Sequence, residues 1–436
     1  MPAPSSLRVA LALPLCLAAC AGDDPGPIVD EDDLFAVARS NEPHDQDPQL
    51  DAEEPEALSA DNHALALDLY HELREGQAAG QGFSISPYSI QTAFGMLYGG
   101  TVEPARSEMA ATLHFSLEGE RLHEAHNWLD AQLAARNLPE EQGKDSVIVQ
   151  TANGVWVLDT LEDQIEAPYL DILSIHYDAG LFLADFFNNP EGERVRINNW
   201  VSEQTRELIP ELFPQGIITS DTRLVLVNAL YLKAPWADTF NPELTTPQTF
   251  TRGDGSSVAV PMMHHGQLPA SYGEGADYQA IAIPLRGSAL ELVVILPDDL
   301  PAFEASMNID SLDALLSGLS PRVVDTTLPR FELEAELELS NELKALGMPS
   351  PFEDTNSFDA ILEELGVITA VVHQTVIEVD EKGIEAAAAT GIVIDKTAAP
   401  EPDATIVVDR PFVLAIRDQP TDTLLFLGRV LDPSEE

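Results

Sequence analysis

Few residues in this 436-residue chain have the types and spacing that enzyme chemistry needs. His123 and His126 are one residue short of the spacing that lets two histidines of a zinc motif share a helix face. His264 and His265 are adjacent in an extended context, where neighbouring side chains point to opposite faces. The sequence contains no Gly-x-Ser-x-Gly elbow, phosphate loop or dinucleotide fingerprint. Because triads are assembled from distant residues, a hydrolase of unfamiliar type stays open as a remote alternative.

The stretch 381–394 offers a different chemistry, that of a conditional strand. It reads Glu-Lys-Gly-Ile-Glu-Ala-Ala-Ala-Ala-Thr-Gly and then Ile-Val-Ile. A two-turn Ala-rich helix capped by Gly391 is the alternative, but such a helix is too short to be stable unaided. A segment that starts with small side chains can instead slide between two existing strands, gaining backbone hydrogen bonds worth about 1 kcal/mol each. With a period of two, one face then carries Ile384, Ala386, Ala388, Thr390, Ile392 and Ile394.

The elements that must position this stretch indicate an α+β fold. Helical patterns dominate the first half and strands the second, without the alternation of a doubly wound sheet. There is no internal repeat and no linker inside 60–432, so we expect one large domain. Helices are predicted at 64–73, 86–100 and 195–212, and strands at 147–158, 223–233, 290–296, 376–380, 406–416 and 424–430.

The N-terminus resembles an export signal. Arg8 is the only charge before Asp23, and the apolar run 9–19 is too short to span a bilayer. The run ends Leu-Ala-Ala-Cys, which resembles a bacterial lipobox, so we expect residues 1–19 to be removed and Cys20 to be lipidated. Simple secretion with a free Cys20 is the alternative. The protein is therefore expected to be exported, and either anchored to the bacterial cell envelope through Cys20 or extracellular.

An acidic stretch follows the signal. Residues 21–60 hold thirteen acidic residues, one arginine and few large apolar side chains. We expect 20–57 to form the anchor cysteine and a flexible tether, and 58–436 to form the folded domain. The alternative is that part of the stretch, such as 34–37, packs on the domain.

Composition excludes several partners. The chain has 74 acidic against 22 basic residues, a formal charge of -52, which excludes nucleic acid as an electrostatic partner. The two cysteines, Cys16 and Cys20, lie within the signal region, so neither a disulfide framework nor a cysteine-rich metal site is expected. We expect no cofactor and no metal.

Several motifs together resemble the serpin family. The stretch 381–391 is similar to the hinge of inhibitory serpins. Residues 83–90, Phe-Ser-Ile-Ser-Pro-Tyr-Ser-Ile, resemble the entry to an early helix, and 226–233 with Trp236 resemble the central strand and its tryptophan. Asp-Arg-Pro-Phe at 409–412 and Phe-Leu-Gly-Arg-Val at 426–430 resemble the C-terminal strands. The order and spacing of these motifs cover about 58–433.

The resemblance implies a single serpin-type domain that acts as an irreversible suicide inhibitor of serine proteases, and of some cysteine proteases. Such a domain has a large mixed central sheet and an exposed reactive loop, here about 381–403, which inserts into the sheet after cleavage and traps the acyl-enzyme. The protein would then be no enzyme, and its partners would be the target protease, bound covalently, and the membrane at Cys20. We expect a monomer. A non-inhibitory serpin-fold binding protein, or a mere protease substrate, is the alternative.

The reactive bond follows from the resemblance as well. Inhibitory loops place it sixteen residues after the hinge glutamate, which gives Thr397 and Ala398 and an elastase- or subtilisin-like target. A frame one residue shorter gives Lys396 and a trypsin-like target. Ile384 is larger than the residue usual at its place, so we expect slower insertion. The implied hinge residues are Glu381, Gly383, Ile384, Glu385, Ala386, Ala387, Ala388, Ala389 and Thr390.

The resemblance also implies supporting contacts under and above the sheet. Ser86, Ser89, Asn228 and His373 should meet as a polar cluster where the sheet opens. Arg330 should face Glu381, in a pair that contributes at most about 1 kcal/mol if exposed. Trp236 is expected near the hinge, with an ordinary core position as the alternative.

Overall fold

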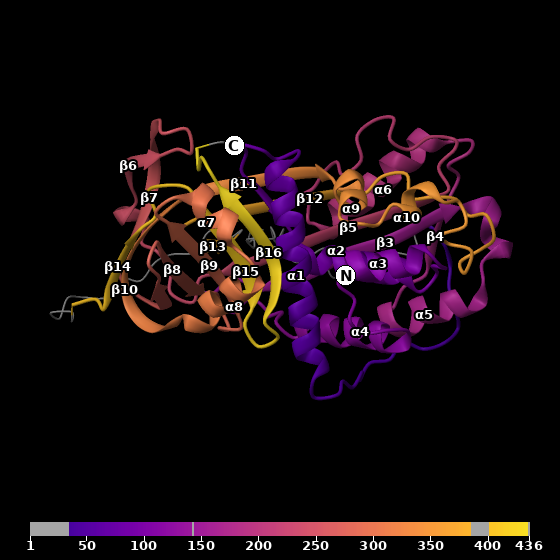
Figure 1. The fold of residues 1–436 in the computed structure, drawn as a ribbon, viewed down its shortest axis with the longest axis horizontal. Helices are drawn as coiled ribbons and strands as arrows, with labels where there is room; N and C mark the ends of the chain where they lie inside the picture. Colours follow the sequence, from indigo (N-terminus) through magenta and orange to yellow (C-terminus); the bar gives the residue numbers. More distant parts are fainter. Residues whose placement is uncertain (1–34, 142–143, 385–400, 435–436) are drawn as a thin grey trace, which may run out of the picture.

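A computed structural model describes residues 35–141, 144–384 and 401–434 (Figure 1). The described chain combines two mixed sheets with helices, so the predicted α+β class is confirmed. The central sheet has the strand order β1 (Ala36–Ala38), β4 (Leu181–Ala184), β3 (Ile148–Leu158), β5 (Leu224–Pro235), β13 (Gly383–Ile384), β12 (Val372–Val379) and β11 (Phe331–Glu338).

The second sheet lies toward the opposite end of the long axis from β4 (Figure 1). It contains most of the late strands, and its edge strand β14 directly follows the reactive-loop stretch. Its order is β14 (Ala404–Val407), β10 (Ser320–Pro329), β7 (Ser257–Glu274), β8 (Tyr278–Pro284), β9 (Leu290–Pro297), β15 (Phe412–Asp418), β16 (Thr423–Val430) and β2 (Phe83–Ile85), with β6 (Thr246–Thr251) paired to β7.

The sequence pattern of each central-sheet strand matches its position. β5 is an almost continuous apolar run with both faces buried, as expected of a strand inside a sheet. β11 alternates strictly, and its apolar residues are buried while its glutamates face solvent. At this sheet edge the row of carboxylates discourages pairing with a foreign strand. The row consists of Glu332, Glu334, Glu336 and Glu338.

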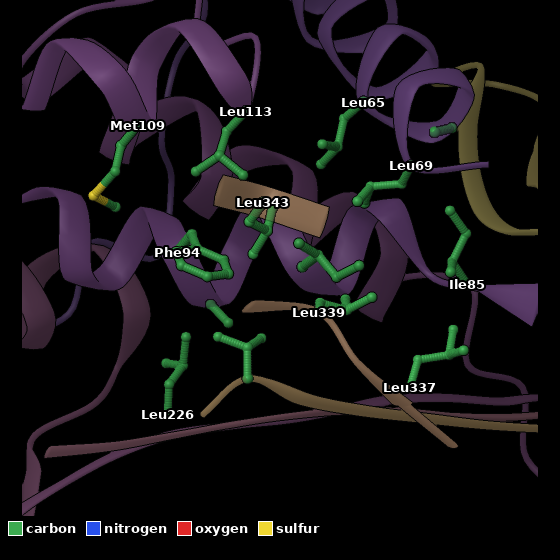
Figure 2. Packing of buried hydrophobic residues seen from close by; sticks show 14 of the residues in the cluster. Leu65, Leu69, Ile85, Phe94, Met109, Leu113, Leu226, Leu337, Leu339 and Leu343 are labelled. Atoms are coloured by element: carbon green, nitrogen blue, oxygen red, sulfur yellow. The ribbon is translucent and has the colours of Figure 1, made fainter. Parts of the chain in front are cut away.

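Helices cover the inner face of the central sheet with one apolar cluster. Figure 2 shows Leu69 and Phe94 pointing toward Leu343, with Leu226 of β5 and Leu337 of β11 on the sheet below. Close packing of this kind supplies most of the stability of a domain without disulfides. The α-helices of the described chain, on both faces, are α1 (Glu54–Glu75), α2 (Pro87–Tyr98), α3 (Ala105–Thr112), α4 (Glu120–Ala134), α5 (Ala167–Tyr177), α6 (Pro190–Gln204), α7 (Leu300–Ser306), α8 (Ile309–Gly318), α9 (Ser340–Ala345) and α10 (Ser350–Glu353).

The outer face of the central sheet carries a second apolar cluster, under α6. Trp200 of α6 packs edge-on against Trp156 of β3, with ring centroids 5.0 Å apart. Val227 of β5 and Val372 of β12 belong to the same cluster. Because these two strands lie on either side of β13, a longer strand inserted between them would divide this cluster.

The acidic N-terminal stretch is folded onto the domain from residue 35. Strand β1 pairs antiparallel with β4. The Phe35 side chain is only 3% exposed, and its ring packs on that of Trp156 with centroids 5.7 Å apart. Gly180 makes room for β1, because a Cβ there would lie 2.6 Å from Val37 and 2.7 Å from the Ala38 carbonyl. The prediction of a flexible tether is therefore wrong for residues 35–57, and 20–34 lie outside the described residues. No described helix has the length and apolarity needed to span a membrane.

Candidate functional site

The hinge stretch forms a strand inside the central sheet. Gly383 pairs with Pro235 and Ile384 with Ala234 of β5, while Ile384 also pairs with Val379 of β12. Further along the sheet, β5 and β12 pair directly with each other. Gly383 and Ile384 of the loop are thus already seated between the two strands.

Gly383 is required by the closeness of β5. A Cβ at this position would lie 2.4 Å from the Ala234 carbonyl oxygen and 2.5 Å from Pro235 Cα, both backbone atoms that cannot move aside cheaply. The backbone φ of +156° is also one that residues with a side chain rarely adopt. Glycine is therefore what permits the hinge to rest in the sheet.

Replacing Gly383 by Ala should release the hinge from the sheet. The added methyl group collides with the β5 backbone, so the two β13 residues should lose their pairing and become accessible. Limited proteolysis and hydrogen exchange of the peptide around residue 383 measure this, with a loss of protection of tenfold or more expected. Gly119→Ala is the matched control, because its φ is also positive but its Cβ would meet nothing within 4 Å. Unchanged protection in Gly383→Ala would contradict the assignment.

Ile384 is 2% exposed and packs into the cluster between the two sheets. Its side chain therefore points inward, as the period-two prediction required. Since it is already inside the sheet before any cleavage, its entry is not a step that must follow cleavage. The expectation of slow insertion therefore no longer follows from the size of this residue.

Glu381 holds the chain just before the hinge. Thr245 Oγ1 donates to its carboxylate at 2.7 Å, and Arg330 Nη1 lies 3.4 Å from it. Burial raises the pKa of Glu381, but these two donors outweigh burial and bring the pKa below its usual value. The expected contact with Arg330 is present, and the half-exposed arginine keeps its energy within about 1 kcal/mol.

Trp236 is tied to the hinge and is not simply a core residue. Its indole Nε1 donates to the Asp380 carbonyl at 2.8 Å, and its backbone N–H donates to the Lys382 carbonyl at 2.7 Å. The Phe240 N–H donates to the Glu381 carbonyl at 2.9 Å. Every carbonyl from 380 to 382 is thus held by the chain that follows β5.

Asp380 and Thr245 are functional residues that the sequence reasoning missed. Asp380 Oδ1 accepts the N–H groups of Lys382 at 2.7 Å and of Gly383 at 3.1 Å, which makes the tight turn from β12 into β13. Asp-x-x-Gly is a turn signal, so this role was readable from the sequence. Thr245 carries no such signal, because its contact depends on tertiary structure.

The predicted polar cluster forms behind the point where β5 and β12 pair. His373 Nε2 accepts the Ser86 N–H at 3.0 Å, and therefore carries no proton. His373 Nδ1 then donates to Asn228 Oδ1 at 3.1 Å. The Asn228 amide donates to the carbonyl and hydroxyl of Ser89, and to Asn153 Oδ1 at 2.8 Å. We call Ser86, Ser89, Asn153, Asn228 and His373 the polar cluster; Asn153 was not predicted.

His373 should make the protein less stable as the pH falls below 6.5. Complete burial lowers the pKa of His373 from 6.5 to about 3, so between these values the unfolded chain binds a proton that the native state does not. This effect vanishes well above pH 6.5, and below it the free energy of unfolding should fall with a slope that approaches about 1.4 kcal/mol per pH unit.

Denaturant titrations at pH 7.0, 6.0 and 5.0 measure this slope for the native protein and for His373→Gln. The variant should be less stable at every pH, yet its slope should be shallower, by an amount that approaches about 1.4 kcal/mol per unit toward pH 5.0. Equal slopes for the two proteins would show that the pKa of His373 is not lowered in the native state.

Part of the predicted site lies outside the described residues. This holds for Glu385 to Thr390 of the hinge, for the reactive-bond residues Lys396, Thr397 and Ala398, and for Cys20. Within the described parts of the chain, no group of three or more histidine, cysteine or acidic residues could hold a metal ion.

Comparisons with known proteins agree with this geometry. The sequence model described as Serpin (serine protease inhibitor) matches residues 60–433. The bovine leukocyte elastase inhibitor is 33% identical over 87% of this chain and 100% of its own length. An uncharacterised serpin-like protein of Methanosarcina mazei is 30% identical over 86% of this chain and 87% of its own. Among solved structures, thyroxine-binding globulin in complex with thyroxine has a TM-score of 0.75 and 25% identity, covering 87% of this chain and all of that one. The chain belongs to the serpin family.

Proposed function

We propose that this serpin is an irreversible suicide-substrate inhibitor of serine proteases. One observation carries the proposal, namely the register of β13 between β5 and β12. If the loop continues in this register along β5, Thr390 comes opposite Asn228. Continued along β12, it comes opposite His373. Asn228 and His373 already pair with each other, so both registers place the inserting loop at the same position between β5 and β12.

The chemistry is supplied by the protease. Its serine Oγ attacks the carbonyl carbon of the reactive bond, the amide bond breaks, and the new amine of the C-terminal fragment takes the proton. The loop remains attached to the protease as an ester. Insertion of the freed loop between β5 and β12 then carries the ester away from the protease groups that activate water, before the ester can be hydrolysed.

We place the reactive bond between Thr397 and Ala398. A small residue before the bond favours elastase- or subtilisin-like proteases. A bond between Lys396 and Thr397 would favour trypsin-like proteases. The name of the bovine relative, leukocyte elastase inhibitor, is in keeping with the first assignment.

The test mixes the protein with subtilisin, elastase and trypsin in turn. We expect an SDS-resistant complex with at least one, and a released peptide that starts at Ala398 by mass spectrometry. The same protease with its serine replaced by alanine is the control and should give no complex. A peptide starting at Thr397 would overturn the bond assignment. Cleavage without a complex would favour a non-inhibitory binding protein, and no complex with any serine or cysteine protease would overturn the inhibitor proposal.

We also propose that the protein is exported and anchored through lipid on Cys20. The folded chain begins at β1, which pairs with β4, toward the end of the long axis away from β14 (Figure 1). An anchor upstream of β1 would therefore join the folded domain on the side of β4. Detergent phase partitioning tests the anchor. The native protein should enter the detergent phase and Cys20→Ser should not; identical partitioning would contradict lipidation.

A further inference from the structure

A polar strap crosses two helices next to the central sheet. We call residues 39–50 the strap; it runs from β1 over the end of α5 to α4. The Asp45 N–H donates to the Ile175 carbonyl at 2.9 Å, and His44 Nδ1 donates to the same oxygen at 2.9 Å. Asn127 of α4 donates to the Asp45 carbonyl at 2.8 Å, and Ser174 Oγ donates to the Glu42 carbonyl at 2.7 Å.

Other contacts of the strap are also polar. Arg39 pairs with Asp178, and Ser40 donates to Asp171. Most strap residues are exposed or half-buried, and Pro48 is the buried exception. A segment with few apolar contacts opens locally at much lower free energy than the whole domain unfolds. The strap can therefore respond to a small change beneath it.

Three histidine side chains lie together beneath the strap. They are His123 and His126 of α4 and His176 of α5, which are 2%, 6% and 6% exposed. The rings of His123 and His176 are stacked with centroids 5.8 Å apart, and His123 Nδ1 lies 2.9 Å from the Tyr177 hydroxyl. The Nδ1 atoms of His126 and His176 are buried and have no hydrogen-bond partner among the residues that the structure describes. Each of these rings is therefore poorly placed to carry a charge.

His176 is the member that the strap covers. It follows Ile175, whose carbonyl receives both strap hydrogen bonds. Burial lowers the pKa of His176, and His44 of the strap acts in the same direction. Glu120 and Glu124 of α4 and Asp45 of the strap act against burial without cancelling it.

The two α4 histidines lie deeper. Burial lowers the pKa of His123 to about 3, helped by His126, His176 and Arg106 of α3. Burial alone lowers the pKa of His126 to about 4. His126 lies beside Tyr177, Phe115 and Gly95, and shares a small cavity with Asp61 of α1 and Tyr88 of α2. Lifting the strap would leave both rings between the helices, so His176 is the one that gains water.

We propose that the strap is an acid-released clamp, closed over neutral His176 at neutral pH and opened when this side chain takes up a proton. Since the closed state disfavours the charged imidazole, protons bind preferentially to the open state. Closure should be independent of pH above about 6.5 and weaken by up to tenfold per pH unit below it. Release would leave β1 held by its short pairing with β4 and by Phe35.

Hydrogen exchange of peptides spanning residues 36–47, corrected for intrinsic rates, tests the clamp between pH 7.5 and 5.0. Protection in the native protein should fall by up to about tenfold from pH 7.5 to 5.5, while β9 stays protected. His176→Asn cannot be charged and should keep its protection to pH 5.0. His176→Arg is always charged and should show an open strap at every pH. If His176→Arg also loses protection in β9, this variant has unfolded as a whole. The pH profile of His176→Asn then tests the proposal.

His114→Asn is the matched control. His114 lies on the surface, bonds Asp68, and has a positive φ that Asn tolerates. This variant should follow the native pH profile. A native profile that is flat, or a fall in His176→Asn as steep as in the native protein, would overturn the proposal.

Discussion

Ala386→Glu should abolish inhibition while leaving the loop cleavable. The register of β13 puts residue 386 between Leu232 of β5 and Ile377 of β12 when the loop inserts. Both neighbours are buried on the inner side of the sheet, in the cluster that also holds Ile384. A carboxylate brought there without a partner costs several kcal/mol, and each 1.4 kcal/mol lost from insertion shifts the outcome tenfold toward hydrolysis.

The measurement is the ratio of cleaved inhibitor to covalent complex on a gel. For Ala386→Glu we expect at least ten times more cleaved product per complex than in the native protein. Ala387→Glu is the matched control, because odd-numbered residues face outward, beside Tyr231 and Val376. Arg206 lies over the Tyr231 ring at 5.7 Å, so a carboxylate there meets a cation. Equal loss in both variants would contradict the register.

Asn228→Ala should lower the stability of the uncleaved protein by about 3 kcal/mol and shorten its active lifetime. The change leaves the buried His373 Nδ1–H and the half-buried Asn153 Oδ1 without the partner they now have, and a buried group left unpaired costs about 1–3 kcal/mol. It also removes the side-chain link at the pair where β5 and β12 meet directly. Insertion of the uncleaved loop should therefore become faster.

Denaturant titration measures the first effect, and loss of protease-trapping capacity during incubation measures the second. Asn188→Ala is the control, because this exposed side chain bonds only the neighbouring Asp185 and should change stability by less than about 0.5 kcal/mol. Full stability in Asn228→Ala would mean that the polar cluster does not hold the sheet closed.

Features that a short stretch of sequence indicates by its own pattern were predictable. The apolar run of β5 lies where the pattern placed it, and Ser86, Ser89, Asn228 and His373 meet as the resemblance implied. Element ends were less predictable. The helix predicted at 195–212 starts with Pro190 at its first turn and ends at Gln204, because Arg206 and Glu207 adopt positive φ. The strand predicted at 406–416 is broken before Phe412, next to Pro411, a residue that cannot donate to a ladder.

Contacts between segments that lie far apart in the sequence were not predictable. That the hinge rests inside the sheet depends on the space that Gly383 leaves beside Ala234 and Pro235, which no single segment reveals. The folding of the acidic stretch was missed because its composition is that of a disordered chain. It is held by Phe35 in a pocket of the domain and by backbone contacts to α5, and neither changes the composition.

The glutamate row of β11 has a consequence for how copies of this protein meet. Two such edges brought together would oppose like charges along their whole length, so the molecules should avoid one another even when crowded. Glu378 of β12 adds to the row, and burial together with Glu332 and Asp380 raises its pKa, so it is among the first to lose its charge on acidification. A sheet that admits a strand of its own chain in the proposed mechanism is thus protected from pairing with the strands of neighbouring molecules, and this protection weakens in acid.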